Sequence, residues 1–312
     1  MDSTPSTEVL HDHHPYFRVY KDGRIERFKE FPYTPPSEDP QTGVKSKDIL
    51  IPPENNVSVR LYLPRTTTPD EKLPIIIYIH GGAFVIESAF SRVYHPYLNS
   101  LAAEAKAIAV SIEYRLAPEH PFPACYDDSW IAFEWVLAHA SSAQGPEAWI
   151  NNHADFARIF LAGDSAGANI AHDVMVRASE KIGPGDEVKI AGMILVHPYF
   201  GDGKPDKLDK LFSLIAPDSS ICDDPRLHPM AHPDLLSRLV CKRVLVLTAE
   251  KDFVRERSLL YYCALKKSRW DGELEMMETE EEGHCFHLPN PTSERARVLM
   301  KRIVTFINQD PS

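Results

Sequence analysis

Short apolar runs rich in β-branched residues recur along the chain and alternate with longer segments whose apolar residues follow helical spacing. Five runs have the length and composition of buried strands, and residues 57–63 alternate like a half-buried strand. The five are LPIIIYIH (73–80), AIAVSIEY (107–114), ARIFLAG (157–163), IAGMILVH (190–197) and RVLVLTA (243–249). Helical spacing marks residues 126–140, 166–178 and 256–267. This alternation predicts an α/β fold with a mostly parallel central sheet and helices on both faces.

Two segments depart from the alternation. The Pro-rich, charged stretch 31–45 reads as a surface connection, which separates an N-terminal arm (residues 1–42) from the main body. Residues 201–233 are rich in Pro, Asp and Gly, carry only a short helical patch, and lie between two strong strands. Functional groups in such folds collect at the carboxyl ends of the strands. We therefore interpret 201–233 as an excursion over the strand ends that walls a binding site.

The strongest chemical motif is Gly163-Asp164-Ser165-Ala166-Gly167, which follows a predicted strand and opens a predicted helix. That context is the one a G-x-S-x-G nucleophile elbow requires. Glycines two residues on either side let neighbouring backbone approach a serine in a strained turn, and the helix N-terminus stabilises negative charge. The motif indicates that Ser165 is a nucleophile.

A serine nucleophile needs a base and an acid that orients the base, in the chain order Ser, Asp or Glu, His. Asp252 follows the strand-like run 243–249, and His284 follows the strand-like run 272–283. We assign Asp252 as the acid and His284 as the base. Glu250 stays open as a second candidate acid and His287 as a second candidate base, while Cys285 is interpreted as a packing residue.

The segment His80-Gly81-Gly82-Ala83-Phe84 follows another predicted strand. Attack on a carbonyl develops charge on its oxygen, and preorganised backbone amides are the main device that stabilises this charge. We assign Gly81 and Gly82 as amide donors of the oxyanion hole, with Ala166 as the third. His80 is interpreted as a structural residue that braces the loop.

Composition narrows the function by exclusion. The 312 residues carry 34 Lys plus Arg against 45 Asp plus Glu, a net charge of −11, which disfavours nucleic acid and anionic membranes as partners. The longest apolar run is only strand-sized, and the first twenty residues lack the features of a secretory signal. We expect a soluble cytoplasmic protein, with an additional nuclear location left open.

Metal and cofactor sites are not expected. The five cysteines form no CxxC pair, which fits a reducing compartment without disulfides or structural zinc; they are Cys125, Cys222, Cys241, Cys263 and Cys285. The run His11-Asp12-His13-His14 has ligand residue types but lies in a polar arm without a second ligand cluster, so we interpret it as a solvated tail. The acidic run 278–282 is interpreted as a solvated loop edge.

Together these pieces resemble the plant carboxylesterases, a branch of the α/β-hydrolase superfamily related to hormone-sensitive lipase. The resemblance runs through YKDGRIER, GVKSKDI, HGGAF, SIEYRLAPEHPFPACYDDSW, NNHADFARIFLAGDSAGANIAH, AEKD and EEGHCFHL. It implies an α/β-hydrolase fold, a cap formed partly by the N-terminal arm, and triad roles for Ser165, Asp252 and His284.

Two departures from the family pattern bear on function. The oxyanion loop of the family is most often HGGGF, whereas Ala83 gives the HGGAF form of legume 2-hydroxyisoflavanone dehydratases; those dehydratases have threonine where this chain has Ser165. The region before Asp223 is also shorter than in many relatives, which affects the shape of the pocket.

Three functions follow from these residues. The first is hydrolysis of small or medium carboxylic esters through an acyl-enzyme. The second is elimination of water or acetate from a plant metabolite at the same site. The third is hormone binding, since the gibberellin receptors resemble this family, but they lack the catalytic histidine that His284 supplies here. The oxyanion loop that begins at His80, the nucleophile Ser165, the acid Asp252 and the base His284 must meet at one site. We therefore expect one domain over 1–312, with 1–42 and 201–233 as cap segments.

Overall fold

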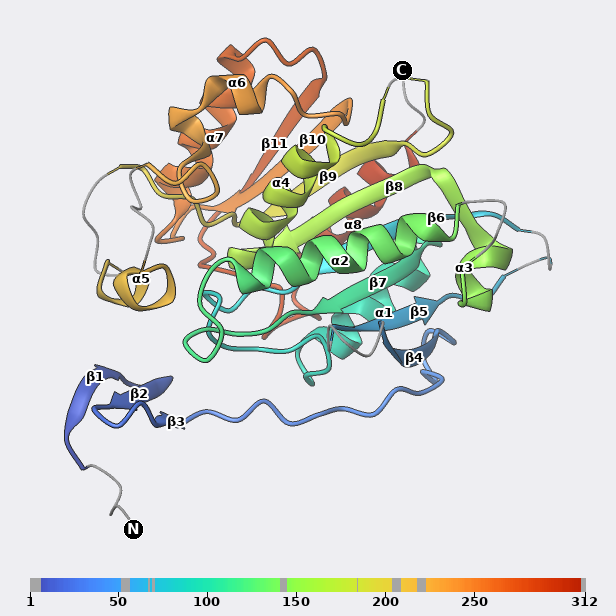
Figure 1. Ribbon diagram of the computed structural model, residues 1–312. Helices are drawn as coiled ribbons and strands as arrows, with labels where there is room; N and C mark the ends of the chain where they lie inside the picture. Colours follow the sequence, from blue (N-terminus) through green and yellow to red (C-terminus); the bar gives the residue numbers. More distant parts are fainter. Residues whose placement is uncertain are drawn as a thin grey trace.

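An eight-stranded sheet forms the centre of the computed structural model (Figure 1), which describes residues 7–51, 57–66, 68, 71–140, 145–183, 185–203, 209–217 and 223–309. The strand order is β11-β10-β9-β8-β6-β7-β5-β4. In this order, every neighbouring pair between β11 and β7 is parallel, including those made by β6. Strand β5 pairs antiparallel with both of its neighbours, β7 and β4. The strands are β4 (Lys45–Leu50), β5 (Ser58–Leu63), β6 (Leu73–Ile79), β7 (Ile108–Glu113), β8 (Ala154–Asp164), β9 (Ile190–Val196), β10 (Arg243–Ala249) and β11 (Glu273–Thr279).

Helices cover both faces of this sheet (Figure 1). Successive side chains of β6 point to opposite faces, so Ile75 and Ile77 join one buried cluster while Ile76 and Tyr78 join the other. The first cluster includes apolar residues of α2 (Ala124–Ala138), α4 (Ala166–Ala178) and α7 (Arg255–Lys267). The second includes those of α1 (Tyr94–Ala105) and α8 (Glu294–Asn308). The predicted α/β architecture is therefore confirmed.

The sequence pattern locates the buried strands of the sheet better than the other elements. Each of the five predicted buried strands coincides with a strand of the sheet, and the predicted helix 166–178 has the bounds of α4. Elements outside the prediction are α1, α8, β4, the helix α3 (Ala148–His153), and three short strands of the arm, which are β1 (Val9–His13), β2 (Phe17–Tyr20) and β3 (Ile25–Arg27).

The N-terminal arm forms an antiparallel three-stranded sheet of its own in the order β1-β2-β3 and continues as an extended segment along the body (Figure 1). Arg27 at its end donates to the carbonyl oxygens of Val85 and Ala117 and pairs with Glu119. Further along, the Thr34 amide donates to the Phe90 carbonyl. The arm is thus anchored on the segments that follow β6 and β7.

The excursion 201–233 is described only in part, because residues 204–208 and 218–222, including Cys222, lie outside the described residues. Its described helices are α5 (Asp209–Ile215), a short 3-10 helix (Pro229–Ala231) and the start of α6 (Pro233–Leu236). The Ile215 carbonyl accepts from the Phe122 amide, which attaches α5 to the loop before α2. In the described part of the chain, no helix has the length and apolar character needed to cross a membrane.

Candidate active site

Ser165 stands between β8 and α4 in a backbone conformation that side chains rarely adopt, with φ 52° and ψ −117°. The flanking glycines explain how the turn is made. A Cβ on Gly163 would lie 2.5 Å from backbone atoms of Gly167, and a Cβ on Gly167 would lie 2.1 Å from the Ile79 carbonyl oxygen. The close approach of β6, β8 and α4 therefore requires both glycines and presents the Ser165 side chain at the carboxyl end of the sheet.

Ser165, His284 and Asp252 meet at this edge although 119 and 32 residues separate them along the chain. His284 Nε2 lies 2.8 Å from Ser165 Oγ, and His284 Nδ1 lies 2.9 and 3.0 Å from the two Asp252 carboxylate oxygens. Because a carboxylate only accepts hydrogen bonds, Nδ1 carries the ring proton and Nε2 is left to accept one from Ser165. This arrangement is able to remove the serine proton.

The two rival residues serve other contacts. Glu250 Oε2 accepts from the Glu281 amide at 2.7 Å, so this carboxylate holds the loop after β11 and does not reach His284. His287 is buried against the Tyr97 ring, and its burial lowers the pKa of the imidazole to about 3. The geometry therefore favours Asp252 and His284 over these alternatives.

His197 is a neighbour of the site that sequence reasoning missed. It follows β9 with φ 50°, and its Nδ1 accepts from the Cys285 amide at 2.7 Å while lying 3.3 Å from Asp252 Oδ2. Burial lowers the pKa of this imidazole to about 3, so the ring is neutral. It holds the His284–Cys285 backbone next to Asp252. The one available sequence signal was a histidine directly at the end of a buried strand.

The contacts of the oxyanion loop disagree with the predicted role of the Gly81 amide. The Gly81 amide donates to Tyr94 Oη at 2.9 Å and lies 3.2 Å from Asp164 Oδ1, so it is used inside the protein and is not a donor to substrate. Among the described residues, no acceptor is found for the amides of Gly82, Ala83 and Ala166. Positive φ values at Gly82 (111°) and Ala83 (53°) turn this stretch of backbone. The donors that remain are Gly82, Ala83 and Ala166.

Asp164 ties the oxyanion loop to the nucleophile turn. Its fully buried carboxyl accepts from the Tyr78 hydroxyl at 2.8 Å and the Tyr94 hydroxyl at 2.9 Å. Desolvation raises the pKa of this carboxyl above its ordinary value. Cys285 Sγ lies 3.6 Å from the same carboxyl, and burial raises the pKa of the thiol far above its usual range. A thiol held in its neutral form is unreactive, which agrees with a packing role for Cys285.

A cluster of aromatic rings packs around Phe84 of the oxyanion loop. Phe84 packs against Phe122, Tyr126, Tyr199 and Phe212 with ring centroids 4.9 to 6.4 Å apart. Phe212 belongs to α5 and also stacks on Tyr199 at 5.3 Å. The excursion thus reaches the oxyanion loop through α5.

Phe253 gives the site an exposed apolar face. It directly follows Asp252, its ring centroid lies 4.6 Å from that of His284, and 69% of its surface is exposed. Among the described residues, no other large apolar side chain is as exposed as Phe253. Single exposed apolar side chains are common, so it is the contact of this ring with His284 that makes Phe253 a candidate for contact with substrate.

A metal ion bound near His284 would compete with the hydrogen bonds that His284 and His197 already make. His197, His284 and Cys285 offer ligand atoms within 4.8 Å of one another. However, His284 Nδ1 faces Asp252, and His197 Nδ1 accepts from the Cys285 amide. In the arm, Asp12 is held by Arg18. These contacts use His284 Nδ1, His197 Nδ1 and Asp12, whereas His197 Nε2 has no hydrogen-bond partner among the described residues.

Comparison with known proteins covers almost the whole chain. A family profile described as "alpha/beta hydrolase fold" matches residues 76–288, and one described as "Carboxylesterase family" matches residues 29–119. The chain is 46% identical to probable carboxylesterase 7 of Arabidopsis thaliana, over 96% of this chain and 99% of that protein. It is 41% identical to 2-hydroxyisoflavanone dehydratase of Glycyrrhiza echinata, over 98% of each. Among solved structures, it is similar to the hyperthermophilic esterase from the archaeon Pyrobaculum calidifontis, with TM-score 0.67, 30% identity and coverage of 84% and 85% of the two chains.

Proposed function

Because the chain belongs to the α/β-hydrolase fold family, in the branch of the plant carboxylesterases, we propose that it is a serine carboxylesterase that hydrolyses small to medium esters through an acyl-enzyme. The observation that carries this proposal is the hydrogen-bonded series Ser165–His284–Asp252 beside three backbone amides without acceptors among the described residues. Esterases among the similar solved structures support the same activity.

The proposed reaction has two halves. Ser165 Oγ attacks the ester carbonyl carbon while His284 Nε2 takes the hydroxyl proton, and Asp252 stabilises the imidazolium that forms. The amides of Gly82, Ala83 and Ala166 donate to the oxyanion. When the carbon–oxygen bond to the alcohol breaks, His284 returns the proton to the leaving alcohol. Water then attacks the acyl-enzyme with the same proton transfers, and releases the acid and free Ser165.

Release of p-nitrophenol from p-nitrophenyl acetate, butyrate and longer esters tests this function. We expect turnover by the purified protein, and labelling of Ser165 by a fluorophosphonate in competition with the ester. Mass mapping of the labelled peptide identifies the residue. Absence of turnover on every ester, or label on a residue other than Ser165, would contradict the proposal.

Elimination is a second candidate, favoured by the dehydratase relatives and by the HGGAF form of the loop. In that reaction His284 would remove a carbon-bound proton while the oxyanion amides hold a carbonyl oxygen. Incubation with 2-hydroxyisoflavanones, followed by chromatography, distinguishes the two: an isoflavone above the uncatalysed background supports elimination, and its absence leaves hydrolysis. A receptor role is disfavoured because His284 contacts Ser165 directly.

We further propose that the arm (1–42) and the excursion (201–233) form the cap over one catalytic domain that spans 1–312. The contacts of Arg27 with the carbonyls of Val85 and Ala117, and of Phe212 with Phe84, support this reading because they join both segments to the loops around the site.

Replacing Phe253 with alanine is expected to raise KM about fivefold to tenfold for esters with an aromatic group, because about 1 kcal/mol of ring contact is lost. Methyl or ethyl esters with no ring should be little affected, and kcat should change less than KM. Steady-state kinetics on a matched pair of aryl and ethyl acetates measures both. Equal changes for the two esters would show that Phe253 does not contact substrate.

A further inference from the structure

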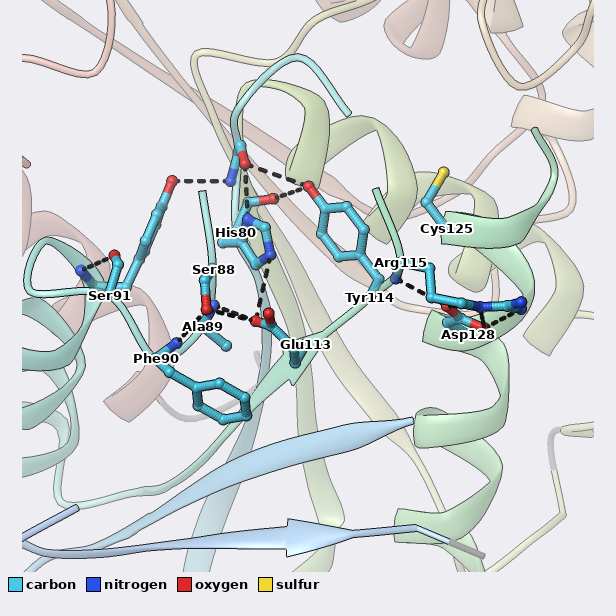
Figure 2. A network of polar contacts seen from close by, with 12 residues as sticks. His80, Ser88, Ala89, Phe90, Ser91, Glu113, Tyr114, Arg115, Cys125 and Asp128 are labelled. Atoms are coloured by element: carbon cyan, nitrogen blue, oxygen red, sulfur yellow. Dashed lines mark hydrogen bonds and ion pairs between the residues drawn. The ribbon is translucent and has the colours of Figure 1, made fainter. Parts of the chain in front are cut away.

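Glu113, the last residue of β7, accepts hydrogen bonds from Ser88 and Ala89 and faces His80, so it lies at both ends of the segment from His80 to Ala89 that contains the oxyanion loop (Figure 2). Its Oε2 accepts from the Ala89 amide at 2.6 Å and from Ser88 Oγ at 2.9 Å, and the same oxygen lies 3.9 Å from His80 Nε2. The segment from His80 to Ala89 contains the amides of Gly82 and Ala83. One carboxyl therefore faces the beginning and the end of the loop whose middle is proposed to bind the oxyanion.

The protonation of His80 follows from its partners. Nδ1 lies 2.7 Å from the Gly81 carbonyl oxygen, which can only accept, so Nδ1 carries the proton. The ring is fully buried and stacks on Tyr114 with centroids 4.2 Å apart, and burial lowers the pKa of the imidazole to about 4. His80 is therefore neutral, and its Nε2 is an acceptor that has no partner among the described residues.

Two hydrogen-bond acceptors, His80 Nε2 and an ionised Glu113 Oε2, therefore face each other. A buried acceptor without a donor costs about 1–3 kcal/mol, and an ionised carboxylate facing it adds repulsion. The separation of 3.9 Å exceeds a direct hydrogen bond, so a proton shared by the two groups requires the Glu113 carboxyl to move toward His80. A single proton between the two groups would satisfy both.

We propose that Glu113 is a positioning residue that shares one proton with His80, and that this shared proton holds the oxyanion loop in its productive geometry. The inference rests on the proposed hydrolase function for its catalytic consequence, although the proton itself does not depend on that function.

The surroundings of Glu113 agree with a retained proton. Desolvation raises the pKa of its carboxyl to about 7, against the opposing effect of the Ala89 amide. The other charged or titratable groups that face it are Arg60 on β5, Asp48 on β4 and the Tyr114 hydroxyl, and Arg60 is already paired with Asp48 at 2.6 Å. Since the pKa in the fold lies above the ordinary value, the proton is held at low pH and is lost as pH rises through about 7.

The remaining contacts keep the pair in place. Tyr114 Oη donates to the His80 carbonyl at 2.9 Å and lies 3.3 Å from the Gly81 carbonyl (Figure 2). Directly after it, Arg115 forms a multiple hydrogen bond with the buried Asp128 of α2. The end of β7 is thereby fixed, so loss of the shared proton is expected to move the loop rather than the strand.

Glu113→Gln and Glu113→Ala separate the proton from the side chain. One oxygen of Glu113 faces His80 and also accepts from Ala89 and Ser88, so a glutamine amide nitrogen in its place donates to His80 Nε2 at every pH, as the protonated acid would, and gives up the bond from Ala89. We expect kcat of the wild type to fall on the alkaline side as Glu113 ionises. Glu113→Gln should lose the alkaline fall, and Glu113→Ala should lower kcat about tenfold with KM nearly constant, because misplacing donors costs less than the roughly 100-fold effect of deleting one.

The matched control is Glu134→Gln on the outer surface of α2, where the carboxylate pairs with Lys181; its pH profile should match the wild type. Thermal unfolding of each variant separates loss of folding from loss of positioning. An alkaline fall in Glu113→Gln equal to that of the wild type would overturn the proposal.

Infrared difference spectra provide a readout that needs no activity. The spectrum of the wild type minus Glu113→Gln, recorded below the pKa of Glu113, should contain the carbonyl band of a protonated carboxyl. Absence of this band overturns the shared proton even if the enzyme is active. Its presence in a protein without esterase activity would instead show that the proton is real and that the hydrolase function is wrong.

Discussion

Ser165→Ala is expected to lower kcat/KM for p-nitrophenyl esters by at least about 10⁴-fold, because removal of a triad nucleophile leaves only the contribution of the oxyanion hole and binding. Alanine keeps the Cβ, so the strained backbone at φ 52° is unchanged and the midpoint of thermal unfolding should stay within a few degrees of the wild type. Initial rates and a thermal melt measure the two quantities.

The matched control for this variant is Ser100→Ala on α1, a half-buried serine whose hydroxyl bonds only to the Pro96 carbonyl among the described residues. Its kcat/KM should equal that of the wild type. If Ser165→Ala retained more than about one hundredth of the activity, an acyl-enzyme at this serine would be excluded.

Asp252→Asn is expected to lower kcat by about 10³- to 10⁴-fold with little change of KM. The asparagine amide would donate to His284 Nδ1, so the ring proton would move to Nε2. A protonated Nε2 cannot accept the proton of Ser165. The asparagine oxygen can still accept from the Val254 amide, which Asp252 Oδ1 binds at 2.9 Å, so the loop should keep its shape. Steady-state kinetics on one ester gives both constants.

Glu250→Gln is the control that decides between the two acids. Glu250 accepts from the Glu281 amide, and a glutamine oxygen can do the same, so activity should stay within about threefold of the wild type. A larger loss in Glu250→Gln than in Asp252→Asn would reassign the acid to Glu250.

The sequence pattern predicts the strands that are buried on both faces, and it overlooks the core helices α1 and α8 as well as the elements formed by exposed or polar residues. The β6 run is apolar at every position and is fully buried, so its hydrophobicity alone marks it as a strand. The strand β4 (KSKDIL) is polar and half-exposed, and it is a strand because it pairs with β5. The arm strands β1 to β3 have three to five residues each, too few for a local pattern to be distinctive.

The candidate site also contains features that the sequence predicts and features that depend on contacts between distant segments. The proximity of Ser165, Asp252 and His284 was predictable because each follows a strand-like run, and the carboxyl ends of parallel strands share one edge. The assignment of Gly81 failed because its amide is taken by Tyr94, 13 residues later, and by Asp164, 83 residues later. The roles of His197, Phe253 and Glu113 were missed for the same reason, since their partners come from other segments.

Local chemistry is readable from a few consecutive residues. Two glycines around Ser165 permit one strained turn, and the order of serine, acid and histidine identifies the reaction class without knowledge of their distances. Which amide is free, which carboxyl keeps its proton and which ring stays exposed depend on burial and on groups brought in from distant segments. A free amide and a shifted pKa are properties of the surroundings, and those surroundings exist only once the sheet has formed and the loops at its edge have packed together.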